Sequence, residues 1–272
     1  MRRQLALRAR VAYHCLEDIG FQPLKLLSLR GLPAYLRDLA TFQRLRCHVL
    51  DITESSVQLA PLFSDRYGGA GAARSLYFLQ DLLCSSRVLK QSHVCHLDIG
   101  SRIDGFVAQI AASRPIDVLD IRPLQCPPTP NLCFVQGDIL DPPSSLERRY
   151  DLVSSLHALE HVGLGRYGDP IAPDGFERAL SNAAALVAPG GRLLISLPVA
   201  EIEHNLIQFN SQRLFSHARL ANLLSVLLPD FVANWSFVID EARKPREACG
   251  DPSSLLATFR GYGLCGVEML RR

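Results

Sequence analysis

His157, Glu160 and His161 are the residues whose types and spacing most clearly suggest chemistry, in the run H-A-L-E-H. Two histidines four positions apart on a long helix would face one zinc ion, and the glutamate beside them would activate water for hydrolysis. A neutral imidazole can instead remove a proton from a substrate hydroxyl. Three glycines follow within two turns, which disfavours a long helix. Zinc hydrolysis is therefore the weaker interpretation, and no metal is expected.

Carboxylates and glycines recur at the ends of successive apolar runs. Asp98 and Gly100 end the first run, and Asp120 ends the second, 22 positions beyond Asp98. Gly137 and Asp138 follow the third run. An acidic residue about 20 positions after a glycine turn is well placed to accept hydrogen bonds from ribose hydroxyls. Asp138 is also expected as a turn cap, because Asp and Asn favour such positions.

Two polar segments are candidates for binding a second substrate. The glycine-rich segment 163–174 contains Arg166 and Tyr167, and it lacks the G-x-x-x-x-G-K-[ST] pattern of a phosphate-binding loop. His204 and Asn210 belong to a polar cluster that follows the fifth strand candidate. We expect these four residues at the substrate site, with a plain connecting loop as the alternative for the segment 163–174.

The elements that must position these residues begin near residue 93, where short apolar runs alternate with helical stretches. The expected helices are Ile103–Ser113, Asp174–Val187 and Arg213–Leu227, and the second opens with Asp174 and Glu177 in the spacing of a capping box. Apolar strands separated by helices predict a doubly wound, mostly parallel α/β sheet, whose last two strands could include an antiparallel member. The expected strands are Val94–Ile99, Asp117–Ile121, Leu132–Gln136, Tyr150–Ser154, Arg192–Leu197, Phe231–Ile239 and Leu264–Leu270.

The first 90 residues form a helical N-terminal extension to the sheet domain at 91–272 in this interpretation, with helices at Pro33–Leu45 and Ala72–Leu89 and a loop at Ser64–Gly71. Residues 1–50 carry eight arginines and one lysine against three acidic residues. This basic arm either contacts an anionic surface, such as a membrane, or forms a solvated helix face. The formal net charge of +2 gives no reason to expect nucleic acid.

Composition bounds the remaining possibilities. The chain has 272 residues, of which 48% are hydrophobic and 21% charged, so disordered, collagen-like and coiled-coil classes are disfavoured. Its apolar runs are shorter than the roughly 20 residues needed to cross a bilayer, and arginines interrupt the segment where a signal peptide would be apolar. The eight cysteines include no C-x-x-C pair. They predict reduced thiols in the cytoplasm.

Together these motifs resemble the class I S-adenosylmethionine-dependent methyltransferases. In that superfamily an acidic residue and a glycine turn follow strand one, an acidic residue ends strand two, and a Gly-Asp pair follows strand three. Here Asp98 with Gly100, Asp120, and Gly137 with Asp138 match, as do E-H at 160–161 and P-G-G at 189–191. The resemblance spans about residues 94–270. It implies a Rossmann-like methyltransferase domain and S-adenosylmethionine as cofactor. The cofactor contacts that it implies are Asp98, Gly100, Ser101, Asp104, Gly105, Asp120, Ile121, Gly137, Asp138, Ile139 and Ser155.

The runs H-L-D-I-G-S-R-I-D-G-F and S-L-H-A-L-E-H-V-G-L-G-R-Y-G-D-P-I resemble, more narrowly, a methyltransferase-like family of unknown function associated with bacterial surface polysaccharide synthesis. This implies O-methylation of a sugar-containing acceptor. From its place just beyond the fourth strand, we expect His161 to be the base and His157 its substitute, with Glu160 orienting a histidine or binding the acceptor. Arg102 and Asp104 replace the second and third glycines of the usual loop, and Asp104 would bring its carboxylate close to the methionine end of the cofactor. A non-catalytic binding or scaffold protein is therefore the alternative.

Overall fold

The computed structural model describes residues 20–21, 27, 29–45, 59, 75–92, 95–125, 129–146 and 149–272. The chain divides into two compact units, Met1–Ala72 and Ala73–Arg272. The first contains helix α2 (Leu32–Leu45), close to the expected bounds. The basic segment 1–10 and the expected loop at 64–71 lie outside the described residues.

Helix α4 (Leu76–Leu89) belongs to the second unit, so the division falls near residue 72 and not at residue 90. Its attachment to the sheet includes the fully buried carboxylate of Glu268, which accepts hydrogen bonds from Arg87 and Gln91 at 2.7 Å each. Asn234 donates a third hydrogen bond at 2.8 Å. Burial would raise the pKa of Glu268, but these donors and the Arg87 charge hold it below its usual range. The helix is thereby fastened to two strands far away in the sequence.

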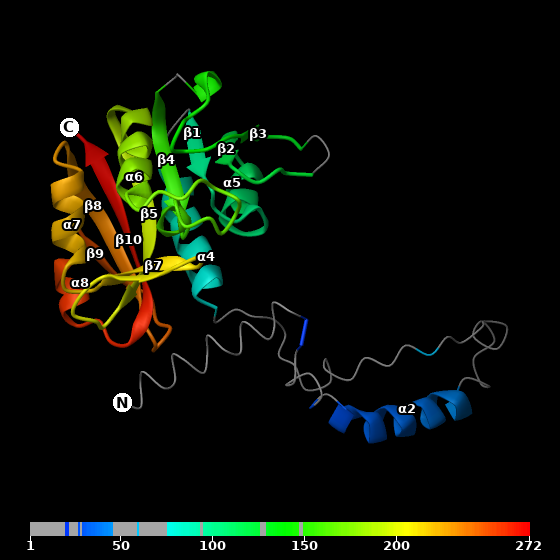
Figure 1. Ribbon diagram of the computed structural model, residues 1–272. Helices are drawn as coiled ribbons and strands as arrows, with labels where there is room; N and C mark the ends of the chain where they lie inside the picture. Colours follow the sequence, from blue (N-terminus) through cyan, green and yellow to red (C-terminus); the bar gives the residue numbers. More distant parts are fainter. Residues whose placement is uncertain are drawn as a thin grey trace. The chain divides into compact units, whose positions relative to one another are not determined.

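The second unit is built on one sheet with strand order β3-β2-β1-β4-β5-β10-β8-β9 (Figure 1). The strands β1 (His96–Ile99), β2 (Ile116–Asp120), β3 (Leu132–Gln136), β4 (Tyr150–Leu156) and β5 (Val187–Ala200) pair in parallel. Strand β10 (Tyr262–Arg271) lies antiparallel between β5 and β8 (Phe231–Ile239), and β9 (Arg246–Cys249) pairs antiparallel with β8. The doubly wound, Rossmann-like α/β architecture is therefore confirmed, including the antiparallel member. The order reverses between β1 and β4, where such sheets bind ligands.

Helices cover both faces of this sheet. On one face, α6 (Gly175–Leu186), α7 (Leu220–Leu227) and α8 (Ser253–Ala257) pack on alternate residues of the strands, such as Leu97 and Ile99. On the other face, α4 and α5 (Ala108–Ala111) pack with a second apolar cluster that includes Phe106 and Leu152. None of the helices in the described parts of the chain is long and apolar enough to span a bilayer.

The segment expected as a helix from Arg213 to Leu227 instead begins with a strand. β7 (Gln212–Ser216) pairs in parallel with the end of β5 and antiparallel with β6 (Leu206–Gln208), and α7 starts only at Leu220. The Arg213 guanidinium is buried and donates to four backbone carbonyls, those of Glu160, Val162, Ala172 and Pro173. These contacts hold Arg213 in the strand and override the apolar periodicity of the segment.

Two helix starts also differ from expectation. The segment from Ile103 opens with a π-helical turn, Ile103–Val107, before α5, which ends at Ala111 rather than at Ser113. Asp174 precedes α6, but its side chain forms no hydrogen bond with the first turn. It lies instead 3.8 Å from Arg178 on the surface. The capping box expected from Asp174 and Glu177 is therefore wrong, although α6 ends close to the expected position.

Candidate functional site

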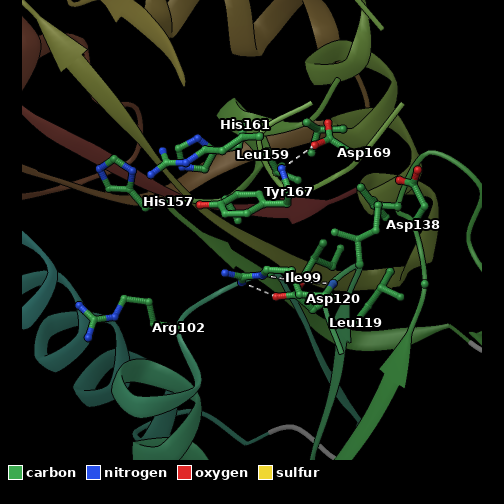
Figure 2. A pocket seen from close by; sticks show the side chains of 18 of the residues that line it. Ile99, Arg102, Leu119, Asp120, Asp138, His157, Leu159, His161, Tyr167 and Asp169 are labelled. Atoms are coloured by element: carbon green, nitrogen blue, oxygen red, sulfur yellow. Dashed lines mark hydrogen bonds and ion pairs between the residues drawn. The ribbon is translucent and has the colours of Figure 1, made fainter. Parts of the chain in front are cut away.

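A pocket of about 190 Å³ lies at the carboxyl ends of the parallel strands, beside the point where strand order reverses (Figure 2). Of the expected site residues, the pocket brings together Gly100, Asp120, Ile121, Gly137, Asp138, Ile139, His157, His161, Arg166 and Tyr167. The expected residues that lie outside its lining are Asp98, Ser101, Asp104, Gly105, Ser155, Glu160, His204 and Asn210.

Asp98 shapes the loop that follows β1. Its carboxylate is fully buried and accepts hydrogen bonds from the backbone and hydroxyl groups of Ser101, at 3.0 and 2.8 Å, and from Ser154 at 2.6 Å. Burial raises the pKa of Asp98 to about 6, against the opposing effect of these donors. The expected cofactor contact of Asp98 is thus replaced by an indirect role, because this network fixes the path of the backbone through Gly100.

The two serines have the same indirect function. The hydroxyl of Ser101 accepts a hydrogen bond from the backbone N–H of Leu156 at 2.9 Å, and Ser155 donates to the carbonyl of Ile99 at 2.7 Å. Both hydroxyls therefore join β1 to β4 beneath the pocket. Gly100 reaches the pocket itself, with φ of +69°, a conformation that glycine adopts readily.

The atypical glycine loop directs Arg102, and not Asp104, to the pocket. Asp104 lies on the surface, with its side chain 75% exposed, and Arg102 donates two hydrogen bonds to it at 3.1 and 2.9 Å. Gly105 packs so closely against the side chain of Asp81 in α4 that a Cβ atom would collide with it. The expected positions of Asp104 and Gly105 at the cofactor are thus corrected: Gly105 permits helix packing, and Asp104 pairs with its neighbour.

Asp120 lines the pocket at the end of β2, but a residue of the same chain holds its carboxylate. Arg122 donates three hydrogen bonds to it, from its backbone N–H at 2.9 Å, its Nε at 3.0 Å and its Nη2 at 2.5 Å. The guanidinium carbon also lies 4.6 Å from the centre of the Tyr167 ring. The carboxylate expected to accept ribose hydroxyls is therefore already paired with a cation in the pocket wall.

Gly137 and Asp138 form the wall next to Asp120. The backbone N–H of Gly137 donates to the carbonyl of Asp120 at 3.0 Å, and a Cβ at Gly137 would come within 2.6 Å of Pro143. Asp138 lines the pocket while its Oδ1 accepts a hydrogen bond from the backbone of Leu140 at 2.8 Å. The turn-cap expectation for Asp138 is confirmed, and its other carboxylate oxygen stays available to a ligand.

The histidines of H-A-L-E-H differ in the group that Nδ1 of each contacts. Nδ1 of His157 contacts Oε1 of the fully buried Glu160 directly. His161 contacts the carbonyl of Ser211 through Nδ1 at 2.5 Å and lies 3.6 Å from Oε1 of Glu160 through Nε2. Burial alone would raise the pKa of Glu160, but the neighbouring histidines hold it below its usual range. The pKa of His161 is lowered, chiefly by burial.

Nε2 of His157 and Nε2 of His161 both lack a hydrogen bond to a described residue, so the direct contact with Glu160 is what distinguishes His157. His157 has φ of +57°, an uncommon conformation outside glycine, and its ring lies 5.1 Å from that of Tyr77 in α4. Leu159–His161 forms one 3-10 turn, so the long helix of a zinc hydrolase is not formed there. The three side chains nevertheless offer ligand atoms within 4.8 Å of one another, and Oε2 of Glu160 has no hydrogen-bond partner among the described residues.

Asp169 organises the glycine-rich loop above the pocket. Its Oδ2 accepts hydrogen bonds from the backbones of Gly163 and Gly165 at 2.7 and 3.2 Å, and its Oδ1 accepts one from Tyr167 at 3.1 Å. The ring of Tyr167 thereby meets that of His161 edge to face, with 5.7 Å between ring centres. Arg166 donates to the carbonyl of Ser211 at 3.3 Å.

His204 and Asn210, which were expected beside the substrate, lie in the segment around β6 and β7 and outside the pocket. His204 is exposed next to Glu203, and Asn210 has φ of +59° in the turn between the two strands. The neighbouring Ser211 supplies the contact with the site through its backbone carbonyl. The sequence could not predict this contact, because a backbone carbonyl does not depend on the residue type. Arg122, which sequence reasoning also missed, had a signal in its position two residues after Asp120, where a long cation can fold back.

A family model described as "Caenorhabditis protein of unknown function, DUF268" matches residues 137–246. No curated protein matches the chain. Similar solved structures include the N-methyltransferase NodS of Bradyrhizobium japonicum WM9 with S-adenosyl-L-homocysteine, at 13% identity and a TM-score of 0.43, covering 71% of this chain and 85% of that one. The magnesium protoporphyrin IX methyltransferase of Synechocystis PCC 6803 with bound SAM has 13% identity and a TM-score of 0.44, covering 80% and 87%.

Proposed function

We propose that this protein binds S-adenosylmethionine in the pocket of Figure 2 and transfers its methyl group to a hydroxyl of a sugar or sugar-containing acceptor. The observation that carries the proposal is the convergence of Asp120, the Gly137-Asp138 turn and the His157–Glu160 pair on one cavity at the switch point of a doubly wound sheet. The sequence resemblance to methyltransferases supports the reaction, and the resemblance of residues 96–106 and 155–171 supports the acceptor.

The residues that line the pocket fit the chemistry of the cofactor. Asp120 and Asp138 offer carboxylate oxygens to ribose hydroxyls and to adenine N–H groups. Apolar side chains line the cavity between them and the histidines, and they suit the faces of an adenine ring. These side chains are Ile99, Leu119, Ile121, Ile139 and Leu159. S-adenosylmethionine would supply a methyl group on an activated sulfonium, so the chain contributes mainly positioning and a base.

His157 is the base that the geometry favours. Glu160 accepts the Nδ1–H of His157, which leaves Nε2 with a lone pair for the acceptor's proton, and Tyr77 and Arg102 line the same side of the pocket. His161, the first candidate by sequence, contacts the carbonyl of Ser211 through Nδ1, and its Nε2 lies 3.6 Å from Oε1 of Glu160, beyond hydrogen-bond distance. The direct contact with Glu160 therefore favours His157, and in this mechanism Glu160 orients His157. His157 would take the proton of the acceptor hydroxyl as its oxygen replaces the sulfonium sulfur on the methyl carbon, so that S-adenosylhomocysteine would be the leaving group.

Two other functions have specific support. Arg122 occupies the carboxylate of Asp120, which favours a non-catalytic binding or scaffold protein. The His157, Glu160 and His161 cluster favours a metal-dependent reaction. Calorimetry with S-adenosylhomocysteine, metal analysis of the purified protein and transfer of labelled methyl to saccharide acceptors separate the three. We expect nucleoside binding and methyl transfer without stoichiometric zinc.

The role of His157 is tested by comparing His157→Ala with His161→Ala. The first should lose about 100-fold or more in turnover while keeping its affinity for S-adenosylhomocysteine, because proton removal belongs to the transition state. Near-normal turnover of His157→Ala, with a large loss in His161→Ala, would return the role to His161, and near-normal turnover in both would leave positioning as the whole mechanism.

A further inference from the structure

Arg102 lines the pocket from the loop after β1, at a position where the methyltransferases that the sequence resembles have glycine. Its side chain is about half exposed and donates two roughly parallel hydrogen bonds to the carboxylate of Asp104. The guanidinium carbon also lies 5.5 Å from the centre of the Tyr77 ring, so a cation–π contact holds it from α4. Arg102 therefore already binds one carboxylate in a bidentate manner.

Arg102 differs from Arg122, another cation of the pocket, in how firmly its partner carboxylate is fixed. Arg122 is held by the nearly buried carboxylate of Asp120. Asp104, by contrast, has a side chain 75% exposed to solvent. Exposed ion pairs contribute little free energy, so a carboxylate from a ligand can replace Asp104 at small cost.

Arg102 also lies at the right end of the pocket for such a ligand. In Figure 2, Asp120 lies between Asp138 on one side and Arg102 on the other. If Asp120 binds the ribose and the adenine ring extends toward Asp138, the substituent on the opposite side of the ribose lies near Arg102. In S-adenosylmethionine that substituent ends in an amino acid, whose carboxylate matches the planar fork of a guanidinium.

We propose that Arg102 forms the carboxylate subsite of the pocket and that Asp104 is an intramolecular competitor displaced when the ligand's carboxylate binds. This inference rests on the proposed function, because it takes the ligand to be S-adenosylmethionine. It explains why the loop tolerates an arginine in place of glycine: the side chain, and not the backbone, receives the amino-acid end of the cofactor.

The test compares two ligands that differ in the carboxylate. S-adenosylhomocysteine contains the amino-acid group, and 5′-methylthioadenosine is a nucleoside thioether without it. Titration calorimetry should show that Arg102→Gln weakens S-adenosylhomocysteine binding about 10- to 100-fold and changes 5′-methylthioadenosine binding less than about 2-fold. Asp104→Asn should leave 5′-methylthioadenosine binding unchanged and tighten S-adenosylhomocysteine binding about 2- to 5-fold.

Arg178→Gln is the matched control, since Arg178 also pairs with an exposed aspartate, Asp174, but on α6 outside the pocket. Equal losses of both ligands in Arg102→Gln, or no loss of either, would overturn the Arg102 subsite. Weaker S-adenosylhomocysteine binding by Asp104→Asn would overturn the competitor role and make Asp104 a ligand contact. If the unaltered protein binds neither compound, the proposed function itself fails. If Arg102→Gln does not fold, Arg102→Lys and Asp104→Asn measure the same ligand difference.

Discussion

Replacing Asp120 by alanine should weaken the binding of S-adenosylhomocysteine by an amount that the Arg122 pair limits. Each hydrogen bond from a ribose hydroxyl to a carboxylate is worth about 1.5 to 3 kcal/mol. Before the ligand binds, however, Arg122 must release the carboxylate. Because the side chain of Arg122 is 47% exposed and that of Asp120 only 8%, this release costs about 1 kcal/mol, the upper end of the range for exposed pairs. For one such bond, the net loss in Asp120→Ala is therefore about 0.5 to 2 kcal/mol, or roughly 2- to 30-fold in Kd.

The same reasoning gives Arg122→Gln the opposite sign. Without the guanidinium, Asp120 is free for the ribose, and affinity should rise by up to about 5-fold. In the double variant Asp120→Ala, Arg122→Gln this gain should vanish, because the carboxylate for which Arg122 and the ribose compete is gone. Arg246→Gln is a matched control, since Arg246 pairs with Asp240 at 2.9 Å outside the pocket.

Titration calorimetry on folded variants at one salt concentration measures all four proteins. Unchanged affinity in Asp120→Ala would refute the assignment of Asp120 to the ribose. Weaker binding in Arg122→Gln would refute the competition between Arg122 and the ribose. It would show that Arg122 contacts the ligand directly.

Three further predictions concern the fold and the basic arm. Glu268→Ala should lower the free energy of unfolding by about 3 to 5 kcal/mol, because Arg87 then loses its buried acceptor. Urea unfolding measures this loss, with Glu268→Gln as the milder variant. A Glu268→Ala protein as stable as the unaltered one would contradict the prediction. The folded pKa of Asp98, about 6, exceeds its unfolded value, so the stability it contributes at low pH should be lost as pH rises from about 4 to 6. Asp98→Asn should flatten this dependence, and an unchanged slope would exclude Asp98 as its source. Deleting residues 1–10 should reduce sedimentation with anionic vesicles at low salt, whereas equal sedimentation of both forms supports a solvated face.

The sheet and the pocket wall could be predicted from the sequence because their signals are local. Apolar runs of strand length followed by Asp98, Asp120 or Gly137 mark where strands end, and parallel strands gather those ends at one edge. The β7 strand could not be found in this way. Its position depends on Arg213 binding carbonyls from a loop about 40 to 50 residues earlier, and no local pattern reports such contacts.

The directions in which individual side chains point also could not be predicted from the local sequence. The glycine loop showed that Asp104 and Arg102 were unusual, but not which of them faces the pocket. That choice depends on Tyr77, which stacks on the Arg102 guanidinium from a helix more than 20 residues away. Likewise, the run H-A-L-E-H did not show which histidine contacts Glu160 through Nδ1. That depends on the carbonyl of Ser211, far away in the sequence, which engages Nδ1 of His161.

Asp98 and Asp120 illustrate how the same residue type takes two roles at adjacent strand ends. Asp98 faces inward, where three donors from Ser101 and Ser154 surround it, and so it fixes the backbone that carries Gly100 into the pocket. Asp120 lies at the pocket surface, where its partner is a flexible side chain that can leave. A buried carboxylate with fixed donors gives rigidity, and a carboxylate with an exchangeable partner can bind a ligand. Under the proposed function the site needs both, because a ribose hydroxyl could replace Arg122 only if the strand ends beneath it stay in place.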